Sequence, residues 1–397
     1  MSRIFVLLAA LGASVFVVGT SEYLVAGLLP QVASDLGVSV AVAGQSVTAY
    51  ALGVVVGGPL VTAATVRLPR RALAVGLLVV FAAGNALCSV APSYGVLILG
   101  RVMASLSHAA FLTLALMLTT KVVRPERVGT AIAGVAAGFS VATLLGVPVG
   151  VLIGESAGWR APFAVLAGLA LVMAVALGIL LPTGERSETR VRDEVRTVVS
   201  RPVLLVVATT AVGMAAVSSV FTYLAPSLRD VAGFGAAAIS GLLVVYGIGS
   251  LVGGLAAGRF ADRSLERTVR GTFGGLAIVL VVVALALPWK VGAVVGVLAF
   301  GLLASATTPT LQSLLLKYAG SAPTLAISVN VAAFNIGIAV GSVVGGLVIA
   351  DVGARWTGLA GAVLSLAGLG LSYLVLPRRR VQPTVADRSD SRVEVSH

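Results

Sequence analysis

The fold is decided by residues 4–29, which read IFVLLAALGASVFVVGTSEYLVAGLL and carry one charged side chain, Glu22. A transmembrane helix needs about 20 predominantly apolar residues, so this stretch is long enough to cross a bilayer. It is too long for the apolar region of a secretory signal peptide, and eleven similar stretches follow it. We therefore expect the chain to cross a membrane twelve times.

The twelve stretches fall into two sets of six. In chain order they are residues 4–29, 40–65, 72–90, 96–120, 129–153, 161–181, 202–225, 236–258, 271–288, 291–316, 324–349 and 357–376. We expect an all-α membrane protein with two pseudo-symmetric six-helix bundles, residues 1–181 and 202–376. Residues 182–201 are interpreted as a cytoplasmic linker and the polar residues 377–397 as a disordered cytoplasmic tail.

The composition agrees with a membrane protein. Of the 397 residues, 58% are hydrophobic and 11% are charged, and the mean hydropathy is +1.08. Soluble domains have about 25% charged residues, so this composition suits a bilayer better than water. The single cysteine, Cys88, lies in an apolar stretch, which excludes an intramolecular disulfide and a CxxC metal or redox site.

Basic residues are distributed unequally between the loops. The formal net charge of +12 would fit a nucleic-acid partner only if the arginines formed a patch. Instead, 22 of the 27 basic residues lie in the N-terminus, alternate loops, linker and tail, which share one side of the membrane. The opposite loops hold Arg160, Arg229, Lys290 and Arg355, and Arg101 lies within a stretch. The positive-inside rule then predicts that both termini are cytoplasmic, and no nucleic-acid partner is expected.

Sequence similarity at an offset of about 195 residues indicates that the halves are related. The first stretch ends Tyr23-Leu-Val-Ala-Gly-Leu-Leu-Pro30, and the seventh ends Phe221-Thr-Tyr-Leu-Ala-Pro226. The fifth is followed by Gly158-Trp159-Arg160, and the eleventh by Gly353-Ala-Arg355-Trp356. Many transporters consist of two similar bundles, so these repeats favour a transporter.

Glycines recur at every fourth position in four stretches. The four seams are Gly53 and Gly57; Gly146, Gly150 and Gly154; Gly249 and Gly253; and Gly337, Gly341 and Gly345. Small residues at this spacing let membrane helices pack closely. Two interpretations stay open: glycine is simply common in this chain, or these four helices form sliding contacts between the two bundles. Pro148 is predicted to bend the helix of the second seam.

These motifs resemble the major facilitator superfamily, and within it the twelve-span drug:proton antiporters. Gly258-Arg-Phe-Ala-Asp262-Arg263 with Arg267 is similar to that family's loop signature G-x-L-A-D-R-x-G-R, in its second-half copy. The first-half copy is degenerate, because Thr62 stands where the aspartate would be. Leu97 to Arg101 resembles the fourth-span signature. Gly146-Val-Pro148-Val-Gly150 resembles the fifth-span signature of antiporters, so these three residues are expected to serve conformational change.

A closer resemblance bears on the cargo. Residues 19–30, residues 221–226 and Gly158-Trp159-Arg160 are similar to the chloramphenicol-resistance exporters of high-G+C bacteria, and also to sugar and purine exporters. The resemblance implies proton-coupled efflux of a small, mostly neutral hydrophobic compound by alternating access, with antibiotic resistance or multidrug efflux as its outcome. Export of a sugar or a purine nucleoside is the alternative.

Three ionisable side chains lie at membrane depth, where such groups are costly and are functional candidates. They are Glu22, Arg101 and His108. Glu22 and Arg101 are predicted to lie at similar depth and to meet as a pair. Either Glu22 is a static partner of Arg101, or it carries the coupling proton. Loss of water favours a neutral carboxyl and a nearby guanidinium favours an ionised one, so a movable arginine would switch proton binding.

The resemblance also implies a substrate cavity between the first, fourth, seventh and tenth spans. The polar and aromatic candidates there and on neighbouring spans are Tyr23, Tyr50, Phe111, Ser219, Tyr223, Thr308, Gln312, Asn330 and Asn335. A cavity with few charges suits chloramphenicol better than a sugar. On the cytoplasmic face, Asp262 is expected either to hold one conformation closed at the start of the fifth span near Gly129, or to pair with Arg259 or Arg263.

Two rival classes are weighed against a transporter. Gly154-Glu-Ser156-Ala-Gly158 matches the GxSxG pattern of serine hydrolases, but no strand precedes it and the histidines are His108 and His397. A membrane sensor or scaffold is the other class, against which the lack of a sizeable soluble domain argues. We expect no enzyme, no metal and no cofactor beyond a proton gradient. We expect a monomer in the plasma membrane, which is the inner membrane in a cell with two membranes. Its expected partners are protons, lipid and a small-molecule substrate.

Overall fold

The computed structural model describes residues 3–65, 68–124, 127–182, 200–319 and 323–376. Residues 183–199 of the expected linker and the whole of the expected tail, 377–397, lie outside the described part of the chain. Described residues form helices joined by short turns.

The N-terminal half contains six spans. They are α1 (Arg3–Leu36), α2 (Val40–Thr65), α3 (Arg70–Ser89) and α4 (Tyr94–Val122), then a composite fifth span, then α7 (Ala161–Leu180). The fifth span consists of α5 (Val128–Val141), the π-helical segment η2 (Ala142–Gly146) and α6 (Val147–Ala157). Pro148 has no N–H to donate to the carbonyl one turn earlier, and the wider π-turn lies directly before it. The helix therefore departs from α geometry at the proline, where the sequence predicts a bend.

The C-terminal half repeats this plan with two differences. It contains α9 (Arg201–Phe221) and the short α10 (Leu224–Asp230), which form one interrupted span, followed by α11 (Ala236–Ala286), α12 (Lys290–Tyr318), α13 (Pro323–Asp351) and α14 (Thr357–Val375). A short 3₁₀ turn, η3 (Ala354–Trp356), precedes α14. The second difference is α11, which is long enough for two spans.

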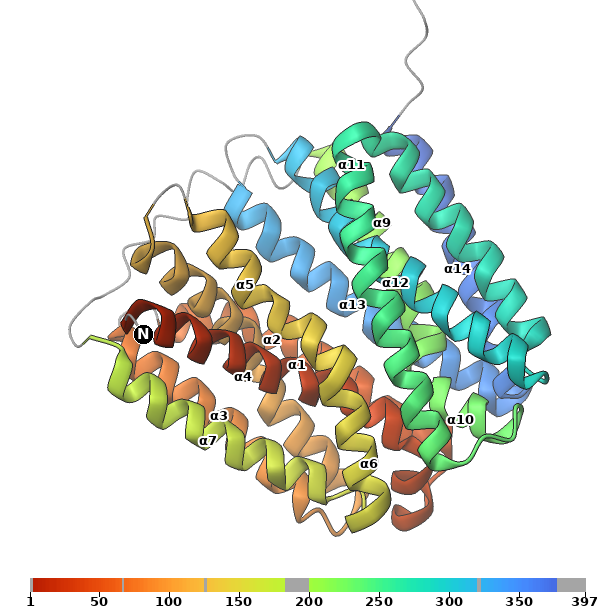
Figure 1. The fold of residues 1–397 in the computed structure, drawn as a ribbon, viewed down its shortest axis with the longest axis horizontal. Helices are drawn as coiled ribbons and strands as arrows, with labels where there is room; N and C mark the ends of the chain where they lie inside the picture. The colour runs from red at the N-terminus through yellow and green to blue at the C-terminus, as the bar shows by residue number, and fades with distance from the viewer. Residues whose placement is uncertain (1–2, 66–67, 125–126, 183–199, 320–322, 377–397) are drawn as a thin grey trace, which may run out of the picture.

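The 51 residues of α11 are two membrane spans joined at a break. A continuous helix of that length would measure about 76 Å, more than twice the hydrocarbon thickness of a bilayer. Ser264 has the non-helical angles φ −158° and ψ 91°, and Figure 1 shows α11 turning back on itself at the top of the molecule. Eleven described helical segments are long and apolar enough to span a membrane, and dividing α11 gives twelve spans. The predicted fold class is confirmed.

The two ends of the molecule differ in charge. We call the end with Arg70, Arg124, Arg201 and the break at Ser264 the basic end, and the opposite end the far end. In Figure 1 the N-terminal half lies to the left and the C-terminal half to the right. The halves pack through α2 against α13 and through η2 and α6 against α11.

Among the described residues, the hydrogen bonds between the halves lie nearer the far end. Ser342 Oγ donates to the carbonyl of Gly44 over 2.9 Å, and Thr48 Oγ1 donates to that of Ala339 over 3.5 Å. Tyr223, in the break between α9 and α10, is fully buried and reaches the carbonyl of Ala41 over 3.5 Å. The halves are therefore joined toward the far end.

The four glycine seams pack helices within each half. In α2, Gly53 and Gly57 face α4, and their equivalents Gly249 and Gly253 in α11 face Leu298 and Leu302 of α12. The seam of the fifth span faces Thr20, Leu24 and Leu28 of α1. The seam of α13 faces Ala211, Ala215 and Ser219 of α9. The four helices meet between the halves, as the second interpretation expects. Their glycines, however, pack within each half, because at these positions a Cβ would overlap the neighbouring helix of the same half.

The predicted internal repeat is seen in the two turns that precede the last span of each half, at the far end. Gly158 and Gly353 have positive φ angles of 85° and 107°, which glycine adopts without strain. Each is followed by an arginine that binds a carbonyl at the end of the third span of its half. Arg160 donates to Ala91, and Arg355 donates to Ala284 over 2.9 Å. The shared turn supports the division into two related halves.

Candidate functional site

A buried polar cluster occupies the interior of the N-terminal half. Glu22 of α1, Tyr50 of α2, and Arg101 and His108 of α4 form it, and none of the four is more than 7% exposed. Arg101 and His108 are seven residues apart, which places them two turns apart on nearly the same face of α4. The helix periodicity therefore brings all three predicted ionisable residues to one place.

Arg101 binds the backbone of α1. Its Nη1 donates to the carbonyl of Ser21 over 2.6 Å, and its Nη2 donates to the carbonyl of Glu22 over 3.2 Å. A carbonyl oxygen has two lone pairs, so both can also accept the hydrogen bond of the helix. The guanidinium carbon lies 4.1 Å from the centre of the Tyr50 ring, a cation–π contact. Within the described chain, Arg101 forms no ion pair with the carboxylate of Glu22, so the two residues meet through the backbone.

The carboxylate of Glu22 faces His108 instead. Glu22 Oε2 lies 4.0 Å from His108 Nε2, which is beyond hydrogen-bonding distance but close enough for a small movement or one water to connect them. The other ring nitrogen, Nδ1, lies 3.2 Å from the hydroxyl of Tyr50. The imidazole also stacks on Phe139, with ring centres 5.7 Å apart. Carboxyl, imidazole and phenol thus form a short row of groups that can hold or pass a proton.

Sequence reasoning missed two residues that contact the cluster or its helix α1, namely Asn85 of α3 and Phe139 of α5. Ser21 Oγ donates to Asn85 Oδ1 over 2.8 Å, and Asn85 Nδ2 donates to the carbonyl of Phe81 over 2.9 Å. Asn85 is an amide in an otherwise apolar stretch, which is a signal that the sequence carried. Phe139, which stacks on His108, gave no such signal, because a phenylalanine in a membrane span is ordinary.

The predicted substrate residues are divided between buried and accessible positions. Six are buried, namely Tyr50, Phe111, Ser219, Tyr223, Asn330 and Asn335. Several of these tie helices together: Thr210 donates to Asn330 Oδ1 over 2.7 Å, and Tyr223 donates to the carbonyl of Ser342 over 3.0 Å. Tyr23 and Gln312 are half-buried, and Thr308 is exposed. These last three keep some exposed surface in this conformation.

A row of aromatic rings leads from the cluster into the C-terminal half. Tyr23 contacts Phe221 edge to face, with ring centres 5.8 Å apart. Phe221 packs on Tyr246 at 4.9 Å, and Tyr246 packs on Phe300 at 5.4 Å. Tyr23, which follows Glu22 in the sequence, is therefore the start of an apolar aromatic surface that crosses between the halves.

The predicted conformational residues lie on the fifth span and on α11. Gly146 and Gly150 pack against α1, and Pro148 begins α6. Asp262, Arg259 and Arg263 lie on α11 at the basic end and are exposed. Among the described residues, Asp262 forms no ion pair with Arg259 or Arg263, and the start of the fifth span near Gly129 lies partly outside the described residues. The predicted ion pair is therefore not formed in this conformation, and the predicted contact near Gly129 stays a prediction.

Twelve spans in two related halves, with a charged cluster buried at membrane depth, define a multi-pass membrane transporter. The sequence pattern of the Major Facilitator Superfamily matches residues 11–324. The chain belongs to this superfamily, whose members are transporters and not enzymes. The resemblance seen in the sequence is confirmed.

Related proteins match this chain over nearly its whole length. It is 35% identical to the inner membrane transport protein YdhP of Escherichia coli K12, over 95% of this chain and 97% of that protein. It is also 35% identical to a chloramphenicol resistance protein of Streptomyces lividans, over 96% of this chain and 98% of that protein. Among solved structures, a bacterial homolog of the human lysosomal transporter Spinster, inward-facing and unoccupied, matches with a TM-score of 0.76 at 15% identity. That match covers 94% of this chain and 97% of the other.

Proposed function

We propose that this transporter exports a small, mostly neutral hydrophobic compound, of the chloramphenicol type, in exchange for protons. The observation that carries the proposal is the carboxylate of Glu22, which is buried at membrane depth beside His108 and has no ion-pair partner in Arg101. An ionisable group kept in such a place at a large cost is a functional candidate. A carboxylate is the group that an antiporter needs to bind and release a proton in each cycle.

Glu22 is proposed to carry the proton, with His108 and Tyr50 beside it. The guanidinium of Arg101 is fixed on the carbonyls of α1, so it supplies a constant positive charge. Dry surroundings favour a neutral carboxyl and a guanidinium favours an ionised one. Entry of water as the halves move changes the balance between the two influences and so couples proton binding to conformation.

The conformation described above is proposed to be the one open to the cytoplasm. The positive-inside pattern supports a cytoplasmic location for the basic end and both termini. The inter-half hydrogen bonds near the far end, at Gly44, Thr48 and Tyr223, would then close the outer side. In the opposite conformation these contacts break, and Asp262 gains a partner at the start of the fifth span. Because one chain carries both halves, we expect a monomer in the plasma membrane.

The aromatic row supports an apolar, ring-containing cargo. Tyr23 and Phe221 are half-buried and present ring surfaces between the halves, beside the proton-carrying residue. Aromatic rings pack favourably on each other, and an apolar pocket with few polar groups suits a neutral molecule. A sugar would need several hydrogen-bonding side chains, of which Thr308 and Gln312 are the accessible candidates.

An efflux panel tests this function. The transporter is expressed in a host that lacks its own drug pumps, and intracellular chloramphenicol, florfenicol, cationic dyes and labelled sugars are measured with and without a protonophore. We expect lowered accumulation of chloramphenicol and florfenicol that the protonophore abolishes. Export of sugars alone would assign the alternative substrate class, and export that ignores the protonophore would contradict proton coupling.

A further inference from the structure

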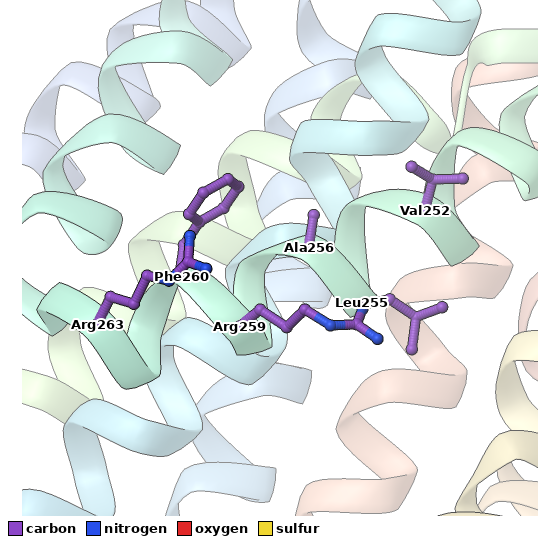
Figure 2. Close-up of a pocket in the computed structure, with 6 residues that line it drawn as sticks. All are labelled: Val252, Leu255, Ala256, Arg259, Phe260 and Arg263. Carbon is purple, nitrogen blue, oxygen red and sulfur yellow. The ribbon is translucent and has the colours of Figure 1, made fainter.

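An apolar groove on α11 ends in two arginines. Figure 2 shows its six lining side chains, Val252, Leu255, Ala256, Arg259, Phe260 and Arg263. All come from the first limb of α11, at spacings of one, three or four residues, so they share one face of the helix. The groove has a volume of about 320 Å³. It plays no part in the proton-coupling cluster or in the aromatic row.

The groove faces away from the interior of the protein. On the adjoining face of the same limb, Tyr246 packs on Phe221 and Phe300, and Gly253 packs on α12. The groove side carries exposed apolar residues, with Val252 51% and Leu255 57% exposed. In a membrane span, an exposed apolar face of this kind is in contact with lipid chains. The apolar lining together with the two arginines suits an occupant with an apolar chain and an anionic head, which the bilayer supplies.

The length of the groove matches the thickness of one leaflet of a bilayer. The groove runs from Val252 to Arg263, a rise of about 16 Å along the helix. One leaflet of a bilayer has a hydrocarbon thickness of about 15 Å. Arg263 lies directly before the break at Ser264, where α11 turns at the basic end. An acyl chain along Val252, Leu255 and Phe260 would therefore place its headgroup at the two arginines.

The basic end of the groove carries two arginine side chains. Arg259 and Arg263 are exposed, and neither forms a hydrogen bond or an ion pair with any residue that the structure describes. Asp262 lies between them in sequence but pairs with neither. Two guanidiniums one turn apart match the geometry of a phosphate group, to which arginine donates two parallel hydrogen bonds.

We propose that this groove is a binding site for an anionic phospholipid of the leaflet at the basic end, with its phosphate on Arg259 and Arg263 and one acyl chain along α11. Because α11 is one of the helices that join the halves, the bound lipid would lie on a helix that moves during alternating access. The site is independent of the cargo and of proton coupling.

Lipid binding to the purified full-length transporter tests the proposal. Native mass spectrometry measures binding of phosphatidylglycerol, with phosphatidylcholine as the uncharged comparison. A basic residue at an anionic membrane surface contributes about 1 kcal/mol, so R259Q/R263Q is expected to weaken phosphatidylglycerol binding about thirtyfold. Arg127→Gln removes an exposed arginine from the same end of the other half, and should leave binding at the wild-type level.

A second variant tests the apolar part without changing charge. Ala256→Trp fills the groove, and should weaken phosphatidylglycerol binding while Arg259 and Arg263 remain in place. Equal binding by wild type and R259Q/R263Q, or by wild type and A256W, would overturn the proposal. Displacement of phosphatidylglycerol by millimolar inorganic phosphate would overturn it as well, since the site would then take a free anion. None of these outcomes bears on whether Glu22 carries protons.

Discussion

At the scale of single residues, structural and chemical roles are separated between Arg101 and Glu22. Arg101 binds two carbonyls of α1 and covers the ring of Tyr50, so it fastens α4 to α1 and α2. The carboxylate of Glu22 is left without an ion-pair partner in Arg101 and faces His108. A proton can therefore bind to or leave Glu22 without breaking the contact that holds the helices together.

Replacement of Arg101 by lysine tests the fastening role. Lysine keeps the positive charge but has one ammonium group, which cannot bind both carbonyls and lie flat on Tyr50. Since a hydrogen bond to a charged group contributes about 1.5–3 kcal/mol, Arg101→Lys should lower the free energy of unfolding by about 2–3 kcal/mol. Denaturation in detergent micelles measures it, with Arg127→Lys as the exposed control. An unchanged midpoint for Arg101→Lys would show that the backbone contacts contribute little.

The residues of the cluster were predictable from the sequence only in part. Glu22, Arg101 and His108 stand out because charged or titratable groups at membrane depth are rare. Their partners depend on how each helix is rotated about its axis, which hydropathy does not specify. This is why the stacking of Phe139 on His108 and the support of Ser21 by Asn85 emerged only from the structure.

At the scale of helices, glycine determines how closely neighbouring spans approach within a half. A Cβ at Gly253 would overlap the backbone of Leu302, whereas a Cβ at Gly258, in the same limb of α11, would meet nothing. Gly253→Ala should therefore destabilise the protein by about 1–3 kcal/mol through overpacking. Gly258→Ala should be neutral or slightly stabilising, because alanine is the better helix former. Thermal unfolding of the two variants measures the difference, and equal melting temperatures would contradict the proposed packing.

Hydropathy predicted the spans well but not their interruptions. Most observed helices begin and end within a few residues of the predicted stretches, because the thickness of a bilayer fixes the length of an apolar run. The π-helical segment before Pro148 and the break at Tyr223 leave no mark in hydropathy. The glycine seams were visible in the sequence, yet their direction was not, since small residues show that helices approach without showing which neighbour they approach.

At the scale of the whole molecule, the two halves are held together near the far end by Tyr223. Its hydroxyl lies where a Cβ on Gly44 of α2 would be, and close to Gly346 of α13. Tyr223 thus fills a space that glycine leaves on both halves. The sequence identified this tyrosine as a candidate for substrate contact, whereas the structure places it in the junction of the halves with no exposed surface.

A small enlargement at Gly44 should shift the conformational equilibrium. Gly44→Ala forces the hydroxyl of Tyr223 away and so weakens closure at the far end. We expect faster maleimide labelling of a buried reporter, Ala339→Cys, in a Cys88→Ala background. The control Gly76→Ala, at a position where a Cβ would meet nothing within 4 Å, should label at the wild-type rate. Unchanged labelling in Gly44→Ala would exclude this junction as the gate.

The central claim is that export is exchanged for protons at Glu22, and one measurement tests it most directly. The wild type and Glu22→Gln, which keeps the size of the side chain but cannot ionise, are reconstituted in proteoliposomes with a compound that the efflux panel identifies. Substrate-dependent proton movement is followed with a pH-sensitive dye, and substrate binding is measured separately. We predict that the wild type moves protons with its substrate and that Glu22→Gln binds the substrate but moves no protons. Undiminished transport by Glu22→Gln, driven by a pH gradient, would contradict the claim.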